Sequence, residues 1–189
     1  MVQVSVTDQL PVDTEALAQN RFRDVMAASP APVTVVTTHG PDGPAGATVS
    51  AFMSLSLEPR LVVVALDRRS RVLSLVEATG SYGVNLLAAN QSSLALRFAR
   101  PGADRFQDTR WHHDHGLPRI EHTAGWLACD LAEVVDGGDH KMLVGAVTDV
   151  SCSPRPPLVY SHRQFGTHSK AQQRHRTPIE AQIAALTYC

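Results

Sequence analysis

Short runs of β-branched or apolar residues, separated by glycine and proline, limit most strongly what this chain can fold into. Every residue of 33–38 is β-branched, which favours a strand, and a turn rich in glycine and proline follows at 39–43. The run 61–66 is apolar at every position, and a strand of that kind is expected to be buried on both faces. The sequence therefore indicates a mainly β protein.

Periodicity and turn residues predict the remaining elements. Strands are expected over 45–54, 82–87, 126–135, 141–150 and 157–165, and helices over 14–28, 72–78 and 90–100, with a weak helix over 178–186. The polar segment 101–123 is expected to be a loop. Strands and helices do not alternate, and no GxGxxG motif occurs, so a doubly wound parallel sheet is not expected. We expect one β-barrel domain with helical additions over 14–167, a flexible segment over 1–13 and a tail over 168–189.

Composition narrows the range of partners. The 189 residues carry a formal net charge of -1, so there is no global basic field to attract nucleic acid, and a small molecule or another protein is expected instead. The cysteines Cys129, Cys152 and Cys189 fit no metal or disulfide spacing and are expected to be reduced thiols. No signal peptide is visible and the longest apolar run is too short for a bilayer, so we expect no membrane association and a cytoplasmic location.

A row of hydroxyls lies in the second expected strand. Thr48, Ser50, Ser54 and Ser56 share one parity, so they could face the same side of a strand and contact a polar ligand lying along it. The alternative is a half-exposed strand whose hydroxyls face water. Taken alone, the row favours that alternative.

A basic cluster follows the apolar run 61–66. It comprises Asp67, Arg68, Arg69, Ser70 and Arg71, and Ser70 stands where a helix is expected to begin. Free backbone N–H groups and the helix dipole favour an anion at such a point, and arginine adds positive charge. A phosphate site and a solvated basic cap are equally compatible with this pattern.

The turn Gly138-Asp139-His140 connects two expected strands. Glycine permits a tight turn, and His140 would begin the second strand, where its ring could donate to a carboxamide or stack on another ring. By itself the tripeptide indicates a surface hairpin. Other histidines gather at 112–115 and at 122, but adjacent histidines in a loop rarely aim at one point, and no CxxC or HExxH motif accompanies them. We therefore expect no metal.

In this order, the segments resemble the short-chain flavin reductases of two-component flavin monooxygenases, which are flavin-binding split-barrel proteins. The resemblance covers about 22–167. The matching stretches are 22–26, 32–38, 48–59, 61–70, 82–87, 97–99 and 138–140. The chain departs from the family at 29–32, where it has Ser-Pro-Ala-Pro in place of the frequent Pro-Thr-Gly, and after Thr167.

The resemblance implies a mainly β, Greek-key-like FMN-binding split barrel with α additions. It implies a homodimer that binds FMN or FAD near the subunit interface. The flavin-binding residues would be Thr34, Thr48, Val49, Ser50, Ala51, Ser54, Leu55, Ser56, Asp67, Arg69, Ser70, Asn85, Arg97 and Phe98. The nicotinamide side, for NADH or NADPH, would be formed by Gly138, Asp139, His140 and Phe165.

The implied activity is hydride transfer from C4 of the nicotinamide to N5 of the flavin. The protein would hold the two rings together, with His140 as a positioning residue and no obligatory catalytic residue. Reduced flavin would then diffuse to a partner monooxygenase. The alternatives are a flavin or haem carrier on the same barrel, which would not need the Gly-Asp-His turn, and an oxidase of the pyridoxine-phosphate oxidase kind.

Overall fold

The computed structural model describes residues 14–100, 102 and 105–168. Its helices are α1 (Thr14–Ala28), α2 (Arg71–Thr79) and α3 (Ser92–Ala99). Its strands are β1 (Ala31–Pro32), β2 (Thr34–Gly40), β3 (Gly43–Val49), β4 (Phe52–Leu57), β5 (Arg60–Asp67), β6 (Ser81–Leu86), β7 (Trp111–Asp114), β8 (Leu117–Ile120), β9 (Gly125–Gly137), β10 (His140–Cys152), β11 (Leu158–Ser161) and β12 (Gln164–Thr167). The expected mainly β content is confirmed. The weak helix expected over 178–186 lies outside the described residues.

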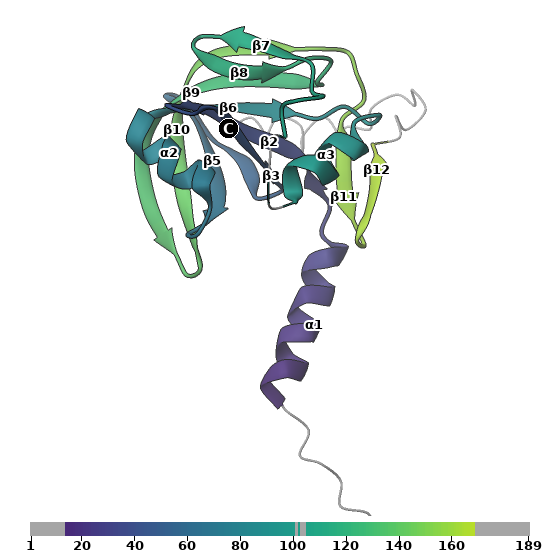
Figure 1. Cartoon of the computed structure of the whole chain (residues 1–189). Coiled ribbons are helices and arrows are strands. Elements are labelled where there is room, and N and C mark those ends of the chain that lie inside the picture. The colour runs from purple at the N-terminus through teal and green to yellow at the C-terminus, as the bar shows by residue number, and fades with distance from the viewer. Residues whose placement is uncertain (1–13, 101, 103–104, 169–189) are drawn as a thin grey trace, which may run out of the picture.

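A seven-stranded antiparallel sheet forms the centre of the molecule (Figure 1). Its order is β3-β2-β6-β9-β10-β5-β4, so the two edge strands, β3 and β4, follow each other directly in the chain. Only Ser50 and Ala51 separate them. Because so few residues span at most roughly 10 Å, the sheet must curl until its two edges approach each other at this point.

The core fills the inside of this curled sheet. The largest fully buried side chains are Trp126, Tyr82 and Phe98. Helix α2 buries Val72 and Val76 against one end of the sheet, and Gly80 closes the helix in the left-handed conformation, at φ 73°, as its position after the apolar run predicts. Within the described part of the chain, no helix is both long and apolar enough to cross a membrane.

Several of the expected elements differ in the structure. The segment 101–123 is not a plain loop, because it contains the hairpin β7–β8, whose residues Leu117 and Ile120 are buried. The single strand expected over 157–165 is the hairpin β11–β12, which turns at His162 and Arg163 with positive φ angles. Helix α3 begins at Ser92, after Gln91 rather than after Asn90.

The strand expected over 45–54 is broken into β3 and β4 at Ser50 and Ala51, and the pairing of β4 with β5 shifts between Ser54 and Ser56. The hydroxyls of this segment therefore do not share one strand face. The expectation that β5 is buried on both faces is also wrong for a single chain. Its positions alternate between buried, as at Val64, and half-buried, as at Val63.

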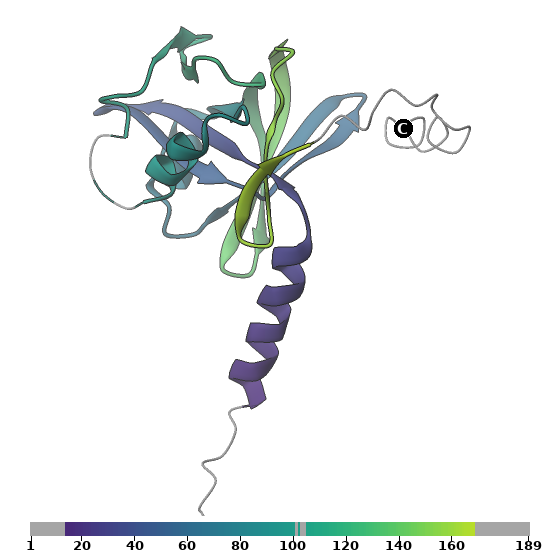
Figure 2. The same cartoon turned by 90° about the vertical axis from the view of Figure 1, so that its right-hand side faces the viewer.

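Helix α1 confirms the expected bounds but lies apart from the core. It projects from the rest of the chain (Figure 2), and none of its residues is buried. Phe22, Val25 and Met26 are 66%, 70% and 51% exposed. Helix α1 therefore carries an exposed apolar surface that the rest of the described chain does not cover.

Candidate functional site

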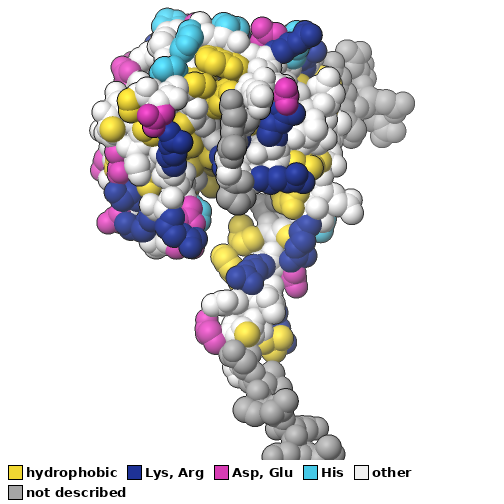
Figure 3. All heavy atoms as spheres, viewed as in Figure 1, with side chains coloured by type: hydrophobic (Ala, Val, Ile, Leu, Met, Phe, Trp, Pro, Cys, Tyr) yellow, Lys and Arg dark blue, Asp and Glu magenta, His cyan; other side chains and the backbone are white. Residues whose placement is uncertain are grey.

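Three segments that are distant in sequence meet at one corner of the sheet. His140, the first residue of β10, lies opposite Asp67, the last residue of β5. The backbone N–H of Ala65 donates to the carbonyl of Ala51 (2.9 Å), which places the β3–β4 break two residues from the end of β5. Space-filling atoms show basic, acidic and histidine side chains gathered where the β9–β10 turn lies (Figure 3). The structure therefore brings the Ser50–Ala51 end of the hydroxyl segment near the arginine and Gly-Asp-His segments, whereas Ser54 and Ser56 pair with Val62 and Leu61, towards the other end of β5.

Arg68 joins the arginine segment to the Gly-Asp-His turn. Its Nε donates to the carbonyl of Gly138 (2.8 Å), its Nη2 contacts Asp136 Oδ1 (2.7 Å), and its backbone N–H donates to the carbonyl of Asp139 (3.1 Å). Gly138 has a φ of 68°, a conformation that glycine adopts without strain. The sequence placed Arg68 in the basic cluster but gave it no link to the Gly-Asp-His turn, because that link depends on the pairing of β5 with β10.

The predicted phosphate residues are tied to each other at the same corner. Arg69 contacts Asp67 through Nε (3.1 Å) and Nη2 (2.9 Å). These hydrogen bonds hold the pKa of the Asp67 carboxyl well below its usual range. The Arg69 side chain is 90% exposed, so its guanidinium can also reach an anion in solvent. The backbone N–H of Ser70 donates to the carbonyl of Asp67 (2.8 Å), and its hydroxyl forms no cap on α2.

His140 is oriented by its neighbour in the turn. Its Nδ1 lies 2.7 Å from Asp139 Oδ1, and this hydrogen bond lowers the pKa of the Asp139 carboxyl. The contact leaves Nε2 free to face a ligand, and the His140 side chain is 42% exposed. Phe165, the fourth residue expected on the nicotinamide side, is not brought to the turn within one chain. It packs against Tyr160 in the hairpin β11–β12, which belongs to a separate three-stranded sheet. This hairpin lies on the right in Figure 1, away from β9 and β10.

The predicted flavin-binding hydroxyls fall into two groups. Thr34 Oγ1 donates to the carbonyl of Val49 (2.7 Å), and Thr48 Oγ1 donates to the carbonyl of Ala95 (2.7 Å), so both hydroxyls are used to hold strands and a helix. The second group consists of four predicted serines whose hydroxyls form no hydrogen bond to the described part of the chain and are open to a ligand. They are Ser50, Ser54, Ser56 and Ser70.

Asn85, Phe98 and Arg97 make their contacts elsewhere in the fold. Asn85 is fully buried and its side-chain amide is hydrogen-bonded on both ends. Phe98 is 1% exposed and packs against Gly46, where an added Cβ would lie 2.9 Å from its ring. Arg97 Nη1 lies 3.3 Å from Thr109 Oγ1. The structure does not bring the buried Asn85 and Phe98 side chains to an open surface. Val49, another predicted flavin residue, is also buried, whereas Ala51 and Leu55 are exposed.

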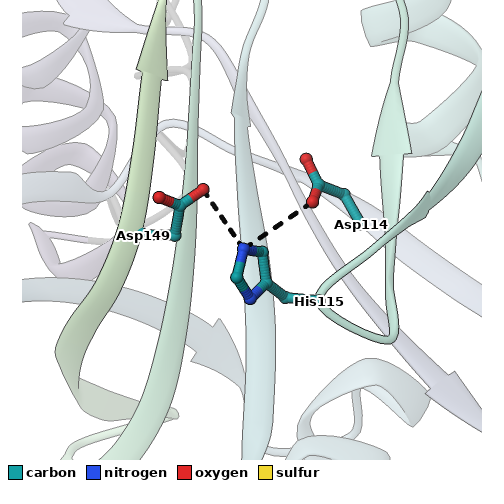
Figure 4. A group of neighbouring side chains, drawn as sticks. All are labelled: Asp114, His115 and Asp149. Carbon is teal, nitrogen blue, oxygen red and sulfur yellow. Dashed lines mark ion pairs between the residues drawn. The ribbon is translucent and has the colours of Figure 1, made fainter.

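The histidine-rich segment has a different arrangement from the one expected. His115 Nε2 lies 3.4 Å from Asp149 Oδ2 and 3.8 Å from Asp114 Oδ1 (Figure 4). Arg119 contacts the other oxygen of Asp114 (2.7 Å), and this hydrogen bond lowers the pKa of that carboxyl. Of the adjacent histidines, only His115 joins this group of two carboxylates. Asp149 comes from β10, so the sequence could not place it there.

Comparison with known proteins decides the family. A family model described as the flavin reductase like domain matches residues 26–169. This chain belongs to that family. The flavin reductase-like chain is 40% identical over 176 residues to the flavin reductase (NADH) of Kitasatospora aureofaciens, covering 88% of this chain and 86% of that protein. It is 37% identical over 173 residues to HsaB, the reductase subunit of a flavin-dependent monooxygenase of Mycobacterium tuberculosis, covering 88% and 92%.

Solved structures of the same family share the fold. The NADH:FAD oxidoreductase SgcE6 of Streptomyces globisporus, solved with NAD and FAD fragments, superposes with a TM-score of 0.79 at 28% identity, covering 87% of this chain and 100% of that one. Nitrilotriacetate monooxygenase component B from Mycobacterium thermoresistibile gives a TM-score of 0.78 at 31% identity, covering 85% and 95%. The resemblance of the ordered segments to flavin reductases is therefore confirmed.

Proposed function

We propose that this chain is an NAD(P)H-dependent flavin reductase, of class EC 1.5.1.-. The observation that carries the proposal is the meeting of the β3–β4 break, the end of β5 and the Gly-Asp-His turn at one corner. Family membership and the similarity to proteins named flavin reductase support it. FMN or FAD and NADH or NADPH are the ligands that the proposal requires.

The flavin lies along the β3–β4 break, with its phosphate towards α2. The free hydroxyls of Ser50, Ser54 and Ser56 supply hydrogen bonds to its polar edge, and Ser70 with the exposed Arg69 guanidinium holds the phosphate. Backbone N–H groups and hydroxyls in a fixed arrangement stabilise the negative charge that develops near flavin N1 and O2. The residues present therefore fit a flavin, whose ring system supplies the redox chemistry.

Gly138, Asp139 and His140 would border the nicotinamide ring where it meets the flavin. His140, held by Asp139, positions the nicotinamide through its free Nε2, and no residue acts as an obligatory acid. The chain's contribution to the rate is to align the two rings and to exclude water between them. The turn is already held in place for this task, because Arg68, next to the end of β5, contacts the Gly138 carbonyl and Asp136.

A homodimer on a split barrel is the assembly that the exposed apolar surface supports. Met53, Val63 and Val144 lie side by side across β4, β5 and β10, and Ala65 pairs with Met142 in the next row. Met53 is 54% exposed and Met142 is 36% exposed. This face adjoins the proposed flavin residues at Ala51. A second copy packed on it would bury the second face of the apolar run 61–66, as the sequence predicts, and would lie beside the flavin.

Reduced flavin leaves this chain by diffusion and is used by a flavin-dependent monooxygenase. Similarity to the reductase subunit HsaB and to the reductase component of a 4-nitrophenol monooxygenase supports a partner of this class. A cytoplasmic location, where the reduced nicotinamide cofactor is made, suits this role.

The decisive experiment follows the oxidation of NADH and NADPH by the purified chain, with and without added FMN or FAD. Nicotinamide oxidation should depend on flavin, and bound flavin should bleach when NADH is added without oxygen. A chain that binds flavin but never bleaches it is a carrier. Turnover that gives a specific organic product with no partner oxygenase identifies an oxidase. Absence of flavin-dependent oxidation with either flavin and either nicotinamide rejects the reductase.

The role of His140 has its own test. His140→Ala should raise the apparent KM for NADH more than it raises the Kd for flavin, because the ring faces the nicotinamide. The matched control is His122→Ala, which removes another exposed histidine away from the turn. An unchanged KM for NADH in His140→Ala removes its assigned role.

A further inference from the structure

A pocket of about 450 Å³ opens beside the arginine segment. Its wall is formed by Phe106 and Trp111, and Arg71, Asp42 and Gln107 stand at its rim, with Pro44 completing the lining. The segments that form it are the β2–β3 turn, the first residue of α2 and the stretch that leads into β7. Nothing in the proposed hydride transfer uses these residues.

The aromatic wall is held in a fixed orientation. Phe106 and Trp111 meet edge to face, with ring centroids 5.4 Å apart and an interplanar angle of 74°. Phe106 is braced from behind by Phe98 (5.0 Å, 87°), and Trp111 by His113 (5.1 Å, 74°). Trp111 is only half-buried, so part of its ring is available to a flat ligand. Stacking on a preset aromatic ring is how proteins hold a nucleobase without ordering a mobile side chain.

The polar groups at the rim match the rest of a nucleotide. Arg71 Nη2 lies 3.0 Å from Asp42 Oδ2, and both side chains are largely exposed, so a ligand can share or replace this weak ion pair. A guanidinium binds phosphate oxygens, a carboxylate accepts from ribose hydroxyls, and the Gln107 amide can pair with the edge of adenine. The three groups and the aromatic wall together present the contacts that an adenosine phosphate requires.

The position of Arg71 distinguishes between the two flavins. Arg71 directly follows Ser70, where the flavin phosphate is proposed to lie. The pocket that Arg71 lines is therefore next to the proposed phosphate position. FMN ends at this phosphate, whereas FAD continues from it into an adenosine monophosphate unit. We infer that the pocket lined by Trp111, Phe106 and Arg71 binds the adenosine end of FAD, so that this chain prefers FAD to FMN. The inference rests on the proposed flavin site.

The test compares the binding of FAD and FMN to the full-length chain, without nicotinamide, by quenching of flavin fluorescence. Wild-type protein should bind FAD about tenfold more tightly than FMN, the gain expected from one stacked base. Arg71→Gln and Trp111→Leu should each raise the Kd for FAD by about tenfold and leave the Kd for FMN unchanged. His112→Leu is the matched control, because its side chain points to the opposite face of β7.

A second measurement does not depend on a variant that folds. The chain has two tryptophans, and Trp126 is 1% exposed, so AMP that enters the pocket should quench mainly the emission of Trp111. AMP should also compete with FAD and not with FMN. Equal affinities for the two flavins in the wild type, or no quenching by AMP, overturn the inference. An equal loss of FMN and FAD affinity in Arg71→Gln also overturns it. A higher KM for NADH in that variant, with FAD binding unchanged, does the same.

These outcomes are distinct from a failure of the proposed function. A chain that oxidises NADH with FMN and FAD equally well, and binds both equally, is a reductase without this pocket function. A chain that binds FAD and AMP at Trp111 but reduces neither flavin retains the adenosine site and loses the proposed activity.

Discussion

Replacing Asn85 with alanine should destabilise the protein strongly without altering how the folded chain binds flavin. Asn85 lies within β6 and is fully buried. Its Nδ2 donates to the carbonyl of Val35 (3.1 Å) and to Thr37 Oγ1 (3.2 Å), and its Oδ1 accepts from the backbone N–H of Ile120 (2.7 Å). These bonds join β6 to β2 and hold the edge of the hairpin β7–β8 on the sheet.

The magnitude follows from the groups that lose their partners. Ile120 is 1% exposed, so its N–H stays buried without an acceptor, which costs about 1–3 kcal/mol. The carbonyl of Val35 and the hydroxyl of Thr37 each lose one bond, and the missing atoms leave a small cavity. The total is about 3 kcal/mol of the free energy of unfolding. For a domain of this size it corresponds to a fall in Tm of roughly 10 °C.

The assay is thermal unfolding of Asn85→Ala without ligand, followed by flavin titration at a temperature where the variant is folded. Asn90→Ala is the matched control, since Asn90 is exposed and its loss should change stability by less than about 0.5 kcal/mol. A Tm for Asn85→Ala close to that of Asn90→Ala, together with weaker flavin binding, would refute the supporting role and return Asn85 to the ligand-binding surface.

Three further predictions test packing, reactivity and pH dependence. Gly145→Ala should lower Tm, because the new Cβ would clash with the hydroxyl of Tyr82, and overpacking of this kind costs about 1–3 kcal/mol. Cys129 should resist iodoacetamide at pH 8 when mapped by mass spectrometry, because burial raises the pKa of its thiol to about 12. Asp114→Asn should lower the urea midpoint at pH 7, and the difference from wild type should shrink below about pH 4, since Arg119 depresses the pKa of Asp114 and that stabilisation is lost on protonation.

Each of these predictions has a control within the chain. Gly166→Ala should leave Tm unchanged, because nothing lies within 4 Å of the added Cβ, and an equal loss in both variants would show that packing at Gly145 is not the cause. Cys152 is exposed and should be alkylated in the same digest, so modification of Cys129 at a similar rate contradicts its burial. A gap between wild type and Asp114→Asn that stays constant from pH 7 to pH 3 argues against the ion pair.

The strands that sequence predicted well are those whose pairing is local. The β-branched run 33–38 lies within β2 with a shift of one or two residues, and 126–135 with 141–150 form the hairpin β9–β10 around the predicted turn. In each case side-chain branching and an adjacent glycine act on the same stretch of chain, so no distant contact is needed to specify the strand.

The hairpin β7–β8 could not be predicted, because it is stabilised from a distance. Trp111 to Asp114 is polar and histidine-rich, which indicates a loop. The hairpin forms because Thr37 donates to the carbonyl of Pro118 (2.6 Å) and Asn85 accepts from Ile120, both from strands far away in sequence. When buried polar residues hydrogen-bond to the backbone of a distant segment, the sequence of that segment shows no hydrophobic periodicity that would predict its strand.

The candidate site shows the same division between local and distant causes. Sequence alone identified the serines of the β3–β4 region and the start of α2, but strand parity grouped Thr48 with Ser50, Ser54 and Ser56 as one surface. The curled sheet separates them, because the chain must cross from one sheet edge to the other at Ser50 and cannot remain a single strand. Thr48 then faces α3, where its hydroxyl is used, and the serines remain open.

The position of the Gly-Asp-His turn depends on a residue outside its own sequence. A two-residue turn between long strands can swing with the twist of the hairpin, since Gly138 and Asp139 are both exposed and a Cβ added at Gly138 would meet no atom within 4 Å. Arg68 removes this freedom by contacting the Gly138 carbonyl and Asp136 at once, and Arg68 itself is placed by the pairing of β5 with β10. A histidine that positions a nicotinamide needs such a tether, because hydride transfer tolerates little misplacement of the two rings.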